Sequence, residues 1–325
     1  MSKILVTGGV GFIGSHIALE LTVLGHDVIT IDDLSGGTAN IVHGVDNHMA
    51  SITDAVAIDS IFAEHNFDYV FHAAAYAAEG LSPFIRKFNY ETNLIGSINL
   101  INSSIKYKVK HFTFLSSIAV YGEESMIEGW GFEKPIDPYG ISKLATEMDL
   151  FAANKQFGLN YTIFRPHNVY GERQNLNDPF RNVVGIFMRR KLLGESVTVF
   201  GDGMQTRSFT YVGDIVPAIC ESITNIDMLN KTFNIGSDDT YTISDLVRLL
   251  NLEKVEYVEE RHEVKHTIPD HRLINDVTTL GNTPLKDGLD TMWRWAQIQD
   301  IKPYTKPNFN LEITKGLPQS WKSLI

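Results

Sequence analysis

The first half of the chain alternates short runs of apolar, β-branched residues with longer stretches in which apolar residues recur at helical spacing. The short runs lie at residues 3–7, 27–31, 68–72, 111–115 and 160–164, and the main helical stretches at 12–24, 84–107 and 139–157. Strands separated by helices of this length predict a parallel sheet with helices on both faces. The pattern therefore predicts an α/β fold, a doubly wound Rossmann sheet with a smaller C-terminal lobe.

The regular alternation fades beyond about residue 165, where loops, short strands and aromatic residues take its place. We expect residues 1–170 to form the sheet domain and residues 171–325 to form mainly a smaller α/β lobe that binds substrate. Short segments at about 207–225 are expected to return to the first domain. Ligands of open parallel sheets bind beyond the carboxyl ends of the strands, so chemically active residues should gather there.

Composition narrows the range of partners. The 325 residues include 28 Lys and Arg against 39 Asp and Glu, a formal net charge of −11. Such a protein has no general attraction for nucleic acid or for an anionic membrane surface, and no stretch approaches the ~18 apolar residues of a membrane span. The single cysteine, Cys220, excludes a disulfide framework within the chain. A cytoplasmic protein without nucleic-acid or membrane partners is expected.

Three glycines follow the first predicted strand at regular spacing. Gly8 suits a tight turn, Gly11 allows the backbone to approach a pyrophosphate, and Gly14 allows the helix to pack on the strand. The free N–H groups at the helix N-terminus would then face the phosphates. Asp32, at the end of the second strand, can accept both hydroxyls of an adenosine ribose and would repel a 2′-phosphate. The pattern favours NAD over NADP, although Asp32 and Asp33 could also be a solvated turn.

A second group of residues is suited to moving a proton. Tyr139 and Lys143 are four residues apart in a predicted helix and therefore lie on one face of it. A lysine ammonium and the positive ring of NAD⁺ are expected to lower the tyrosine pKa from about 10, which would make Tyr139 a usable base. Ser117, at the end of the 111–115 strand, could hold the reacting oxygen beside it. Taken alone, such a Tyr–Lys spacing is equally typical of an ordinary amphipathic helix.

Together these segments make the chain resemble an extended short-chain dehydrogenase/reductase of the NAD-dependent epimerase/dehydratase family. The matching segments are 7–14, 72–75, 93–96, 116–122, 138–143, 165–171, 200–203, 207 and 211–214. The resemblance covers the chain from residue 3 to about 296. It implies that NAD contacts Gly8, Gly11, Phe12, Ile13, Gly14, Asp32, Asp33, Ala73, Ala74, Asn93, Tyr139, Lys143 and Pro166.

The two positions after Ser117 distinguish between activities within this family. Dehydratases and decarboxylases of the family generally carry an acid after the serine, where this chain has Ile118 and Ala119. The remaining Ser117, Tyr139 and Lys143 suffice for the reversible oxidation of one carbinol, which is the chemistry of a 4-epimerase. The resemblance thus implies an isomerase of nucleotide sugars, a UDP-glucose/UDP-galactose 4-epimerase that works through a transient 4-keto sugar.

The same resemblance assigns the substrate contacts. Asn168 and Asn182 would contact the sugar diphosphate, Phe200 would lie against the uracil, and Arg207 and Arg261 would meet the diphosphate, with Ser117 at the reacting sugar hydroxyl. Epimerisation of another nucleotide sugar (UDP-N-acetylglucosamine, UDP-glucuronate, a GDP- or dTDP-sugar), a related dehydratase or reductase, and a non-catalytic NAD-sensing module stay open as alternatives.

Two further expectations concern assembly and metal. The resemblance implies a homodimer in which the helices at 84–107 and 139–157 pair with their copies in a four-helix bundle. The segment 262–266 matches the His-Glu-x-x-His pattern of zinc proteases. That pattern needs a helix to bring both histidines to one face, and this segment reads as a loop or extended chain. No metal site is expected.

Overall fold

The computed structural model describes residues 1–37, 39–123, 133–260, 264–266, 270–304, 309–322 and 324. Its centre is a seven-stranded parallel sheet with the strand order β11-β6-β5-β4-β1-β2-β3. The strands are β1 (Lys3–Thr7), β2 (Asp27–Asp32), β3 (Asp46–Met49), β4 (Tyr69–His72), β5 (His111–Leu115), β6 (Tyr161–Pro166) and β11 (Lys231–Ile235). The order reverses between β1 and β4, which is where an open parallel sheet binds its ligands.

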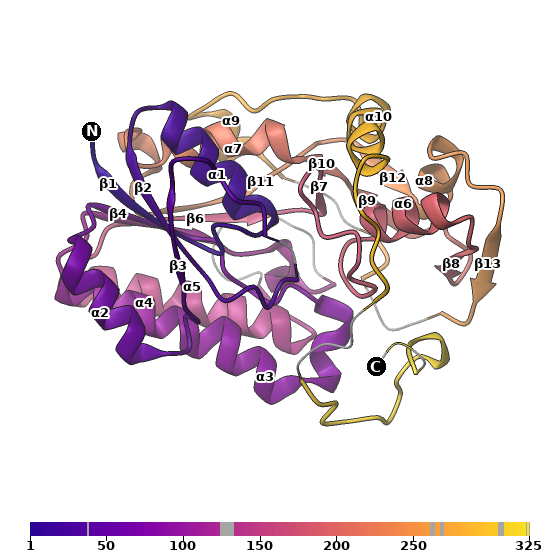
Figure 1. The fold of residues 1–325 in the computed structure, drawn as a ribbon, viewed down its shortest axis with the longest axis horizontal. Coiled ribbons are helices and arrows are strands. Elements are labelled where there is room, and N and C mark those ends of the chain that lie inside the picture. The colour runs from indigo at the N-terminus through magenta and orange to yellow at the C-terminus, as the bar shows by residue number, and fades with distance from the viewer. Residues whose placement is uncertain are drawn as a thin grey trace.

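Helices cover both faces of the sheet. On one face lie α1 (Phe12–Val23) and α7 (Val212–Glu221), and on the other α2 (Ala55–His65), α4 (Gly96–Lys106) and α5 (Pro138–Phe157) (Figure 1). Successive side chains of a strand point to opposite faces. Accordingly Ile4 and Val6 belong to the core under α1 and α7, whereas Leu5 belongs to the core under α2, α4 and α5. The predicted doubly wound α/β fold is confirmed.

The helical stretch expected at 84–107 is interrupted. It consists of a short 3₁₀ helix, η1 (Glu79–Phe84), then α3 (Arg86–Tyr90), a single π turn, η2 (Glu91–Ile95), and finally α4. The π turn contains Asn93, whose side chain bonds to the backbone N–H and C=O of Tyr76. Single π turns of this kind often occur where a helix supports a functional site.

A smaller lobe follows the sheet domain. It contains α6 (Val183–Leu193), α8 (Ile243–Leu249) and α10 (Leu285–Ala296), with the paired strands β7 (Val169–Tyr170) and β10 (Thr210–Tyr211), β8 (Val197–Phe200) and β13 (Val255–Val258), and β9 (Thr206–Ser208) and β12 (Thr240–Thr242). The short helix α9 (Arg272–Asn275) instead packs on β11 of the main sheet. Besides η1, the 3₁₀ helices of the described residues are η3 (Ile118–Tyr121), η4 (Ile226–Met228) and η5 (Gln319–Trp321). The segment expected to return to the sheet domain contains α7, which packs on α1, and β11 then extends the sheet beside β6.

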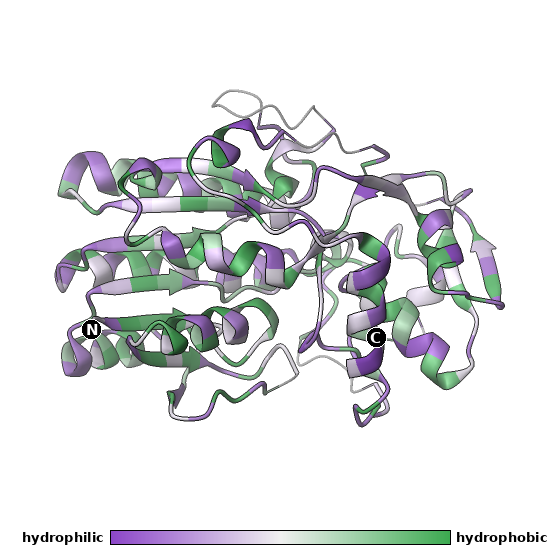
Figure 2. Cartoon of the chain, turned by 90° about the horizontal axis from the view of Figure 1, so that it is seen from above, coloured by the Kyte–Doolittle hydropathy of each residue, from purple (hydrophilic) through white to green (hydrophobic). Residues whose placement is uncertain are grey.

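The distribution of hydropathy explains which strands the sequence pattern reveals. Strands at the centre of the sheet are hydrophobic, and hydrophilic residues lie on the outer faces of the helices (Figure 2). The edge strand β3 reads Asp-Asn-His-Met and is largely exposed, so it lacks the apolar run by which the inner strands were predicted. Within the described ranges no helix combines the length and apolar character that crossing a bilayer requires.

Candidate active site

A cavity of about 690 Å³ lies at the carboxyl ends of the strands, between the sheet and the C-terminal lobe. Its wall includes nearly all of the residues that the sequence assigns to cofactor and substrate. These are Gly8, Gly11, Phe12, Ile13, Gly14, Asp32, Asp33, Ala73, Ala74, Ser117, Tyr139, Lys143, Pro166, Asn168, Asn182, Phe200 and Arg207. Residues from Gly8 to Arg207 thus line one cavity.

The glycine turn is shaped to admit a pyrophosphate. Gly8 has a φ of +66°, and the Gly11 N–H donates to its carbonyl at 3.0 Å. A Cβ on Gly14 would overlap that same carbonyl, so the helix can approach the turn this closely only with glycine there. Helix α1 begins at Phe12 without a side-chain cap. Its first N–H groups and its positive dipole end are therefore available to an anion in the cavity.

Asp32 ends β2 at the edge of this turn. Its carboxylate accepts the Leu34 N–H at 2.8 Å and the Val10 N–H at 3.3 Å, which fixes its orientation toward the cavity wall. Burial raises the pKa of the Asp32 carboxyl, while the same N–H groups lower it. A fixed carboxylate beyond the glycine turn can accept the hydrogen bonds that the two hydroxyls of a ribose donate, so the residues present fit NAD.

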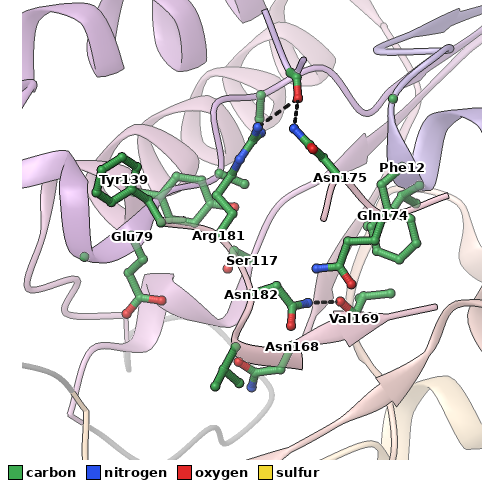
Figure 3. Close-up of a pocket in the computed structure, with 18 of the residues that line it drawn as sticks. Phe12, Glu79, Ser117, Tyr139, Asn168, Val169, Gln174, Asn175, Arg181 and Asn182 are labelled. Carbon is green, nitrogen blue, oxygen red and sulfur yellow. Dashed lines mark hydrogen bonds between the residues drawn. The ribbon is translucent and has the colours of Figure 1, made fainter. Parts of the chain in front are cut away.

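Ser117, Tyr139 and Lys143 converge from two elements. Ser117 follows β5 and occupies the N-cap of η3, where its hydroxyl accepts the Ala119 N–H at 3.1 Å. Tyr139 and Lys143 lie in the first turns of α5, which starts sharply because Asp137 caps it and Pro138 occupies its first turn. The Ser117 side chain lies near enough to the Tyr139 phenol to lower its pKa, and Figure 3 shows both residues at the cavity.

Lys143 is held in place rather than mobile. Its ammonium donates to the Leu115 carbonyl at 2.7 Å and lies 4.8 Å from the ring centre of Phe114 and 5.8 Å from that of Tyr139. Burial lowers the pKa of Lys143 to about 7, and Glu147 opposes this shift. The Lys143 side chain is 3% exposed. Bulk water therefore screens its charge little, and neighbouring groups of the site interact strongly with that charge.

The expected lowering of the Tyr139 pKa is not found in the chain alone. Burial raises the pKa of the Tyr139 phenol, and the charges of Glu79 and Asp137 raise it further. The hydrogen bond from Ser117 and the charge of Arg181 lower it, but by less. The physical reason is that the phenol is desolvated while the Lys143 ammonium is bonded to a carbonyl instead. An activated tyrosine here requires additional positive charge in the cavity.

Asn93, an expected cofactor contact, is placed differently from the other residues of that group. It does not line the cavity but lies behind it, 1% exposed. Its amide group bonds to both backbone groups of Tyr76 and to the Asn89 side chain at 2.9 Å. These bonds satisfy the amide and fix the segment that follows β4, so Asn93 supports the wall of the site without belonging to it.

The predicted substrate residues come from the C-terminal lobe and the loop before it. The Asn168 amide donates to the Ser208 carbonyl at 3.3 Å, and Asn182 caps α6 while its amide donates to the Val169 carbonyl (Figure 3). Asn168 and Asn182 have positive φ angles of 30° and 55°, a conformation that asparagine tolerates well. Phe200 and Arg207 line the same cavity. Arg261 falls outside the described residues.

Several wall residues were not predicted from sequence. Glu79 and Arg181 both act electrostatically on Tyr139, and Arg181 is bonded to Asp178 at 2.5 Å and to the Gly36 carbonyl at 3.1 Å. The C-terminal tail also reaches the cavity through Lys315, Gly316, Pro318 and Trp321. None of these lies in a recognisable sequence motif. The one signal for the tail is Trp321, a large aromatic residue near the end of the chain.

The histidine-rich segment is only partly described, because His262 and Glu263 fall outside the described ranges. Residues 264–266 have no helical structure, and the Lys265 carbonyl accepts the Thr206 N–H at 2.9 Å. Among the described residues, no group of three or more His, Cys, Asp or Glu side chains is arranged to hold a metal ion.

Comparison with known proteins identifies the family. Residues 4–236 match the model of the NAD dependent epimerase/dehydratase family. The chain belongs to this family. Its cofactor is accordingly NAD, which the glycine turn and Asp32 fit.

Individual relatives span most of the chain. A putative UDP-glucose 4-epimerase of Methanocaldococcus jannaschii is 33% identical over 90% of this chain and 98% of its own length. The crystal structure of UDP-glucose 4-epimerase from Thermotoga maritima with UDP-glucose has a TM-score of 0.86, 36% identity, and covers 90% of this chain and 98% of that chain. A UDP-N-acetylglucosamine 4-epimerase from Methanobrevibacter ruminantium M1 has a TM-score of 0.82, 30% identity, and covers 90% and 97%.

Proposed function

We propose that this member of the family is a nucleotide-sugar 4-epimerase acting on UDP-glucose and UDP-galactose. The observation that carries the proposal is the convergence of Ser117, Tyr139 and Lys143 with the glycine turn in one cavity. The positions after Ser117 are Ile118 and Ala119, which cannot transfer a proton. Relatives whose names specify UDP-glucose 4-epimerases support the choice of sugar.

Each side chain has a specific task in the proposed cycle. NAD, when bound, supplies a reversible hydride acceptor for C4 of the sugar. Tyr139 takes the proton of the 4-hydroxyl through its phenolate oxygen and later returns it. Ser117 holds the same sugar oxygen by hydrogen bonding, and Lys143 stabilises the phenolate electrostatically. Asn168, Asn182, Phe200, Arg207 and Arg261 bind the nucleotide part, so that the 4-keto sugar can turn over without leaving the cavity.

Proton NMR of UDP-glucose incubated with the purified protein, with and without added NAD, tests the proposal. We expect signals of UDP-galactose to appear without a net change in NAD(H) absorbance, because each turnover restores the cofactor. Conversion of UDP-N-acetylglucosamine alone would assign the enzyme to that sugar, for which the M. ruminantium relative is the precedent. Retention of NAD with no conversion of any UDP-, GDP- or dTDP-sugar would contradict catalysis and favour an NAD-sensing role.

Glu79 provides a test that separates epimerisation from elimination. Its charge raises the pKa of Tyr139, so Glu79→Gln should lower that pKa and increase the phenolate fraction at a given pH. We expect the rising limb of the pH profile of kcat to move to lower pH while the epimerase activity is kept. A general loss of activity at every pH would instead identify Glu79 as a proton-transferring residue, as a dehydratase needs.

An apolar stripe on α5 supports the proposed homodimer. Ile141, Met148 and Phe151 are 40%, 59% and 41% exposed, and Ile95, in the turn before α4, is 50% exposed. Large apolar side chains gathered on one helix surface mark an association site. The positions are separated by seven and three residues, which places them along one face of the helix.

Replacement of Met148 by glutamate is expected to convert the dimer to a monomer, because it would bury two like charges about the two-fold axis. Light scattering coupled to size exclusion should give twice 36.5 kDa for the wild type and 36.5 kDa for the variant. Ile298→Glu, at an 80% exposed apolar residue after α10, serves as the matched control and should stay dimeric. A wild-type mass of 36.5 kDa would contradict the proposal.

A further inference from the structure

Residues 309–322 form a segment, here called the C-terminal strap, that packs beside the cavity. Leu317 and Trp321 are buried, and the Trp321 ring meets Phe180 edge-on at 5.2 Å and Phe84 at 6.4 Å between ring centres. At the other end Phe309 lies 4.8 Å from Phe88. The yellow end of the chain in Figure 1 accordingly runs past α3 toward the C-terminal lobe.

Hydrogen bonds fix the middle of the strap to η1 and α3. The Glu312 carboxylate accepts the N–H groups of Lys87 and Phe88 at 2.8 and 3.1 Å, which caps the start of α3. In return, the Glu312 N–H donates to the Phe84 carbonyl at 2.9 Å. The strap therefore has a defined position on the protein rather than a loose surface path.

The element to which the strap is bonded also contacts the catalytic helix. In η1, the Ser82 hydroxyl donates to the Asp137 carboxylate at 3.3 Å and accepts the Tyr139 N–H at 3.2 Å. Asp137 is the N-cap of α5. The strap, η1 and the start of α5 thus form a continuous bonded unit around one side of the cavity.

The cations of the cavity wall show what the strap adds. Four cations of the wall already donate hydrogen bonds to other residues of the protein. Lys143 donates to the Leu115 carbonyl and Arg173 to the Ser15 carbonyl. Arg181 donates to the Asp178 carboxylate and the Gly36 carbonyl, and Arg207 donates to the Thr206 and Lys265 carbonyls. Lys315 of the strap is the fifth wall cation. It is exposed and makes no hydrogen bond or ion pair with any residue that the structure describes. In a protein of net charge −11, a free ammonium on a cavity wall is available for an anionic ligand.

The strap also lies outside what the family match describes, which ends at residue 236. The T. maritima enzyme is covered over 98% of its length, yet it accounts for 90% of this chain. A tenth of the chain therefore has no counterpart in that relative.

We propose that the C-terminal strap is part of the substrate-binding site, and that Lys315 binds an anionic oxygen of the nucleotide sugar. The proposal rests on the proposed function for the class of ligand. The charge can come from the diphosphate or from a carboxylate on the sugar, and both present the oxygen acceptors that an ammonium prefers. Trp321 and Glu312 hold the strap in the position that brings Lys315 to the wall.

Calorimetric titration of the NAD-loaded protein with UDP, UDP-glucose and UDP-glucuronate tests the assignment. A charge-assisted hydrogen bond accounts for about tenfold in affinity, so Lys315→Ala should raise Kd about tenfold and Lys315→Arg should restore it. A loss for all three ligands would place the diphosphate at Lys315, and a loss for UDP-glucuronate alone would place the carboxylate there. Unchanged Kd values for all three would overturn the proposal.

Lys322→Ala is the matched control, because Lys322 is an exposed strap lysine that does not line the cavity. Trp321→Ala should weaken binding as well, although Lys315 is intact, because the strap loses its anchor. In steady-state assays the Lys315 variant should raise KM with kcat little changed, as expected for a purely binding interaction. If the wild type binds UDP but converts no sugar, the proposed function fails and the Kd values still decide the role of the strap.

Discussion

Replacement of Tyr139 by phenylalanine is expected to lower kcat by about 10²- to 10⁴-fold, the range associated with loss of a general base. The change removes a single oxygen, the phenol oxygen whose pKa Ser117 lowers. The ring is 8% exposed and its packing is kept, so the variant should fold and retain NAD. Turnover of UDP-glucose followed by NMR, together with the NAD content released on denaturation, measures the two effects separately.

A second buried tyrosine provides the control for this variant. Tyr161 begins β6, at the far end of the sheet from the cavity, and is 3% exposed. Tyr161→Phe should therefore leave kcat within about twofold of the wild type, a barrier change of less than half a kcal/mol. Full activity in the Tyr139 variant would remove this residue from the chemistry and would require another group to accept the proton.

Replacement of Arg165 by methionine is expected to lower the free energy of unfolding by about 3–5 kcal/mol, the cost of leaving a buried charge unpaired. Arg165 is 2% exposed and Glu147 is fully buried. The guanidinium donates to Glu147 at 3.0 and 2.5 Å, to Glu133 at 2.8 Å and to the Tyr121 hydroxyl at 2.7 Å. The variant would leave the buried Glu147 carboxylate without the guanidinium that pairs with it.

Urea denaturation at one saturating NAD concentration for all proteins measures this loss, since bound ligand itself adds stability. Glu147→Gln is the informative comparison, because it leaves Arg165 with Glu133 and Tyr121 as partners and should cost less. The Ser116 hydroxyl donates to the Glu147 carboxylate, so Glu147 is bonded to the residue directly before Ser117. Equal unfolding midpoints for the wild type and Arg165→Met would show that the pair contributes no net stability.

The glycine turn and the Tyr–Lys pair could be predicted because their geometry is set by neighbours in sequence. A tight turn after a strand, or two side chains four residues apart in a helix, depends on local backbone conformation alone. The same holds for Ser117 and Asp32, which directly follow apolar runs. The parallel sheet then follows from the alternation of strands and helices, and it gathers the strand ends, and with them these residues, at one edge.

The features that depend on contacts between distant segments were decided by the tertiary structure. The strap reaches the cavity through bonds between Glu312 and residues more than two hundred positions earlier, and no local pattern encodes such a contact. Asn93 lies behind the wall because the loop at Tyr76 takes its amide. In the chain alone burial raises the Tyr139 pKa, because desolvation is a property of the assembled core. Sequence therefore determined which groups are present and on which elements, whereas packing determined their surroundings and hence their charge.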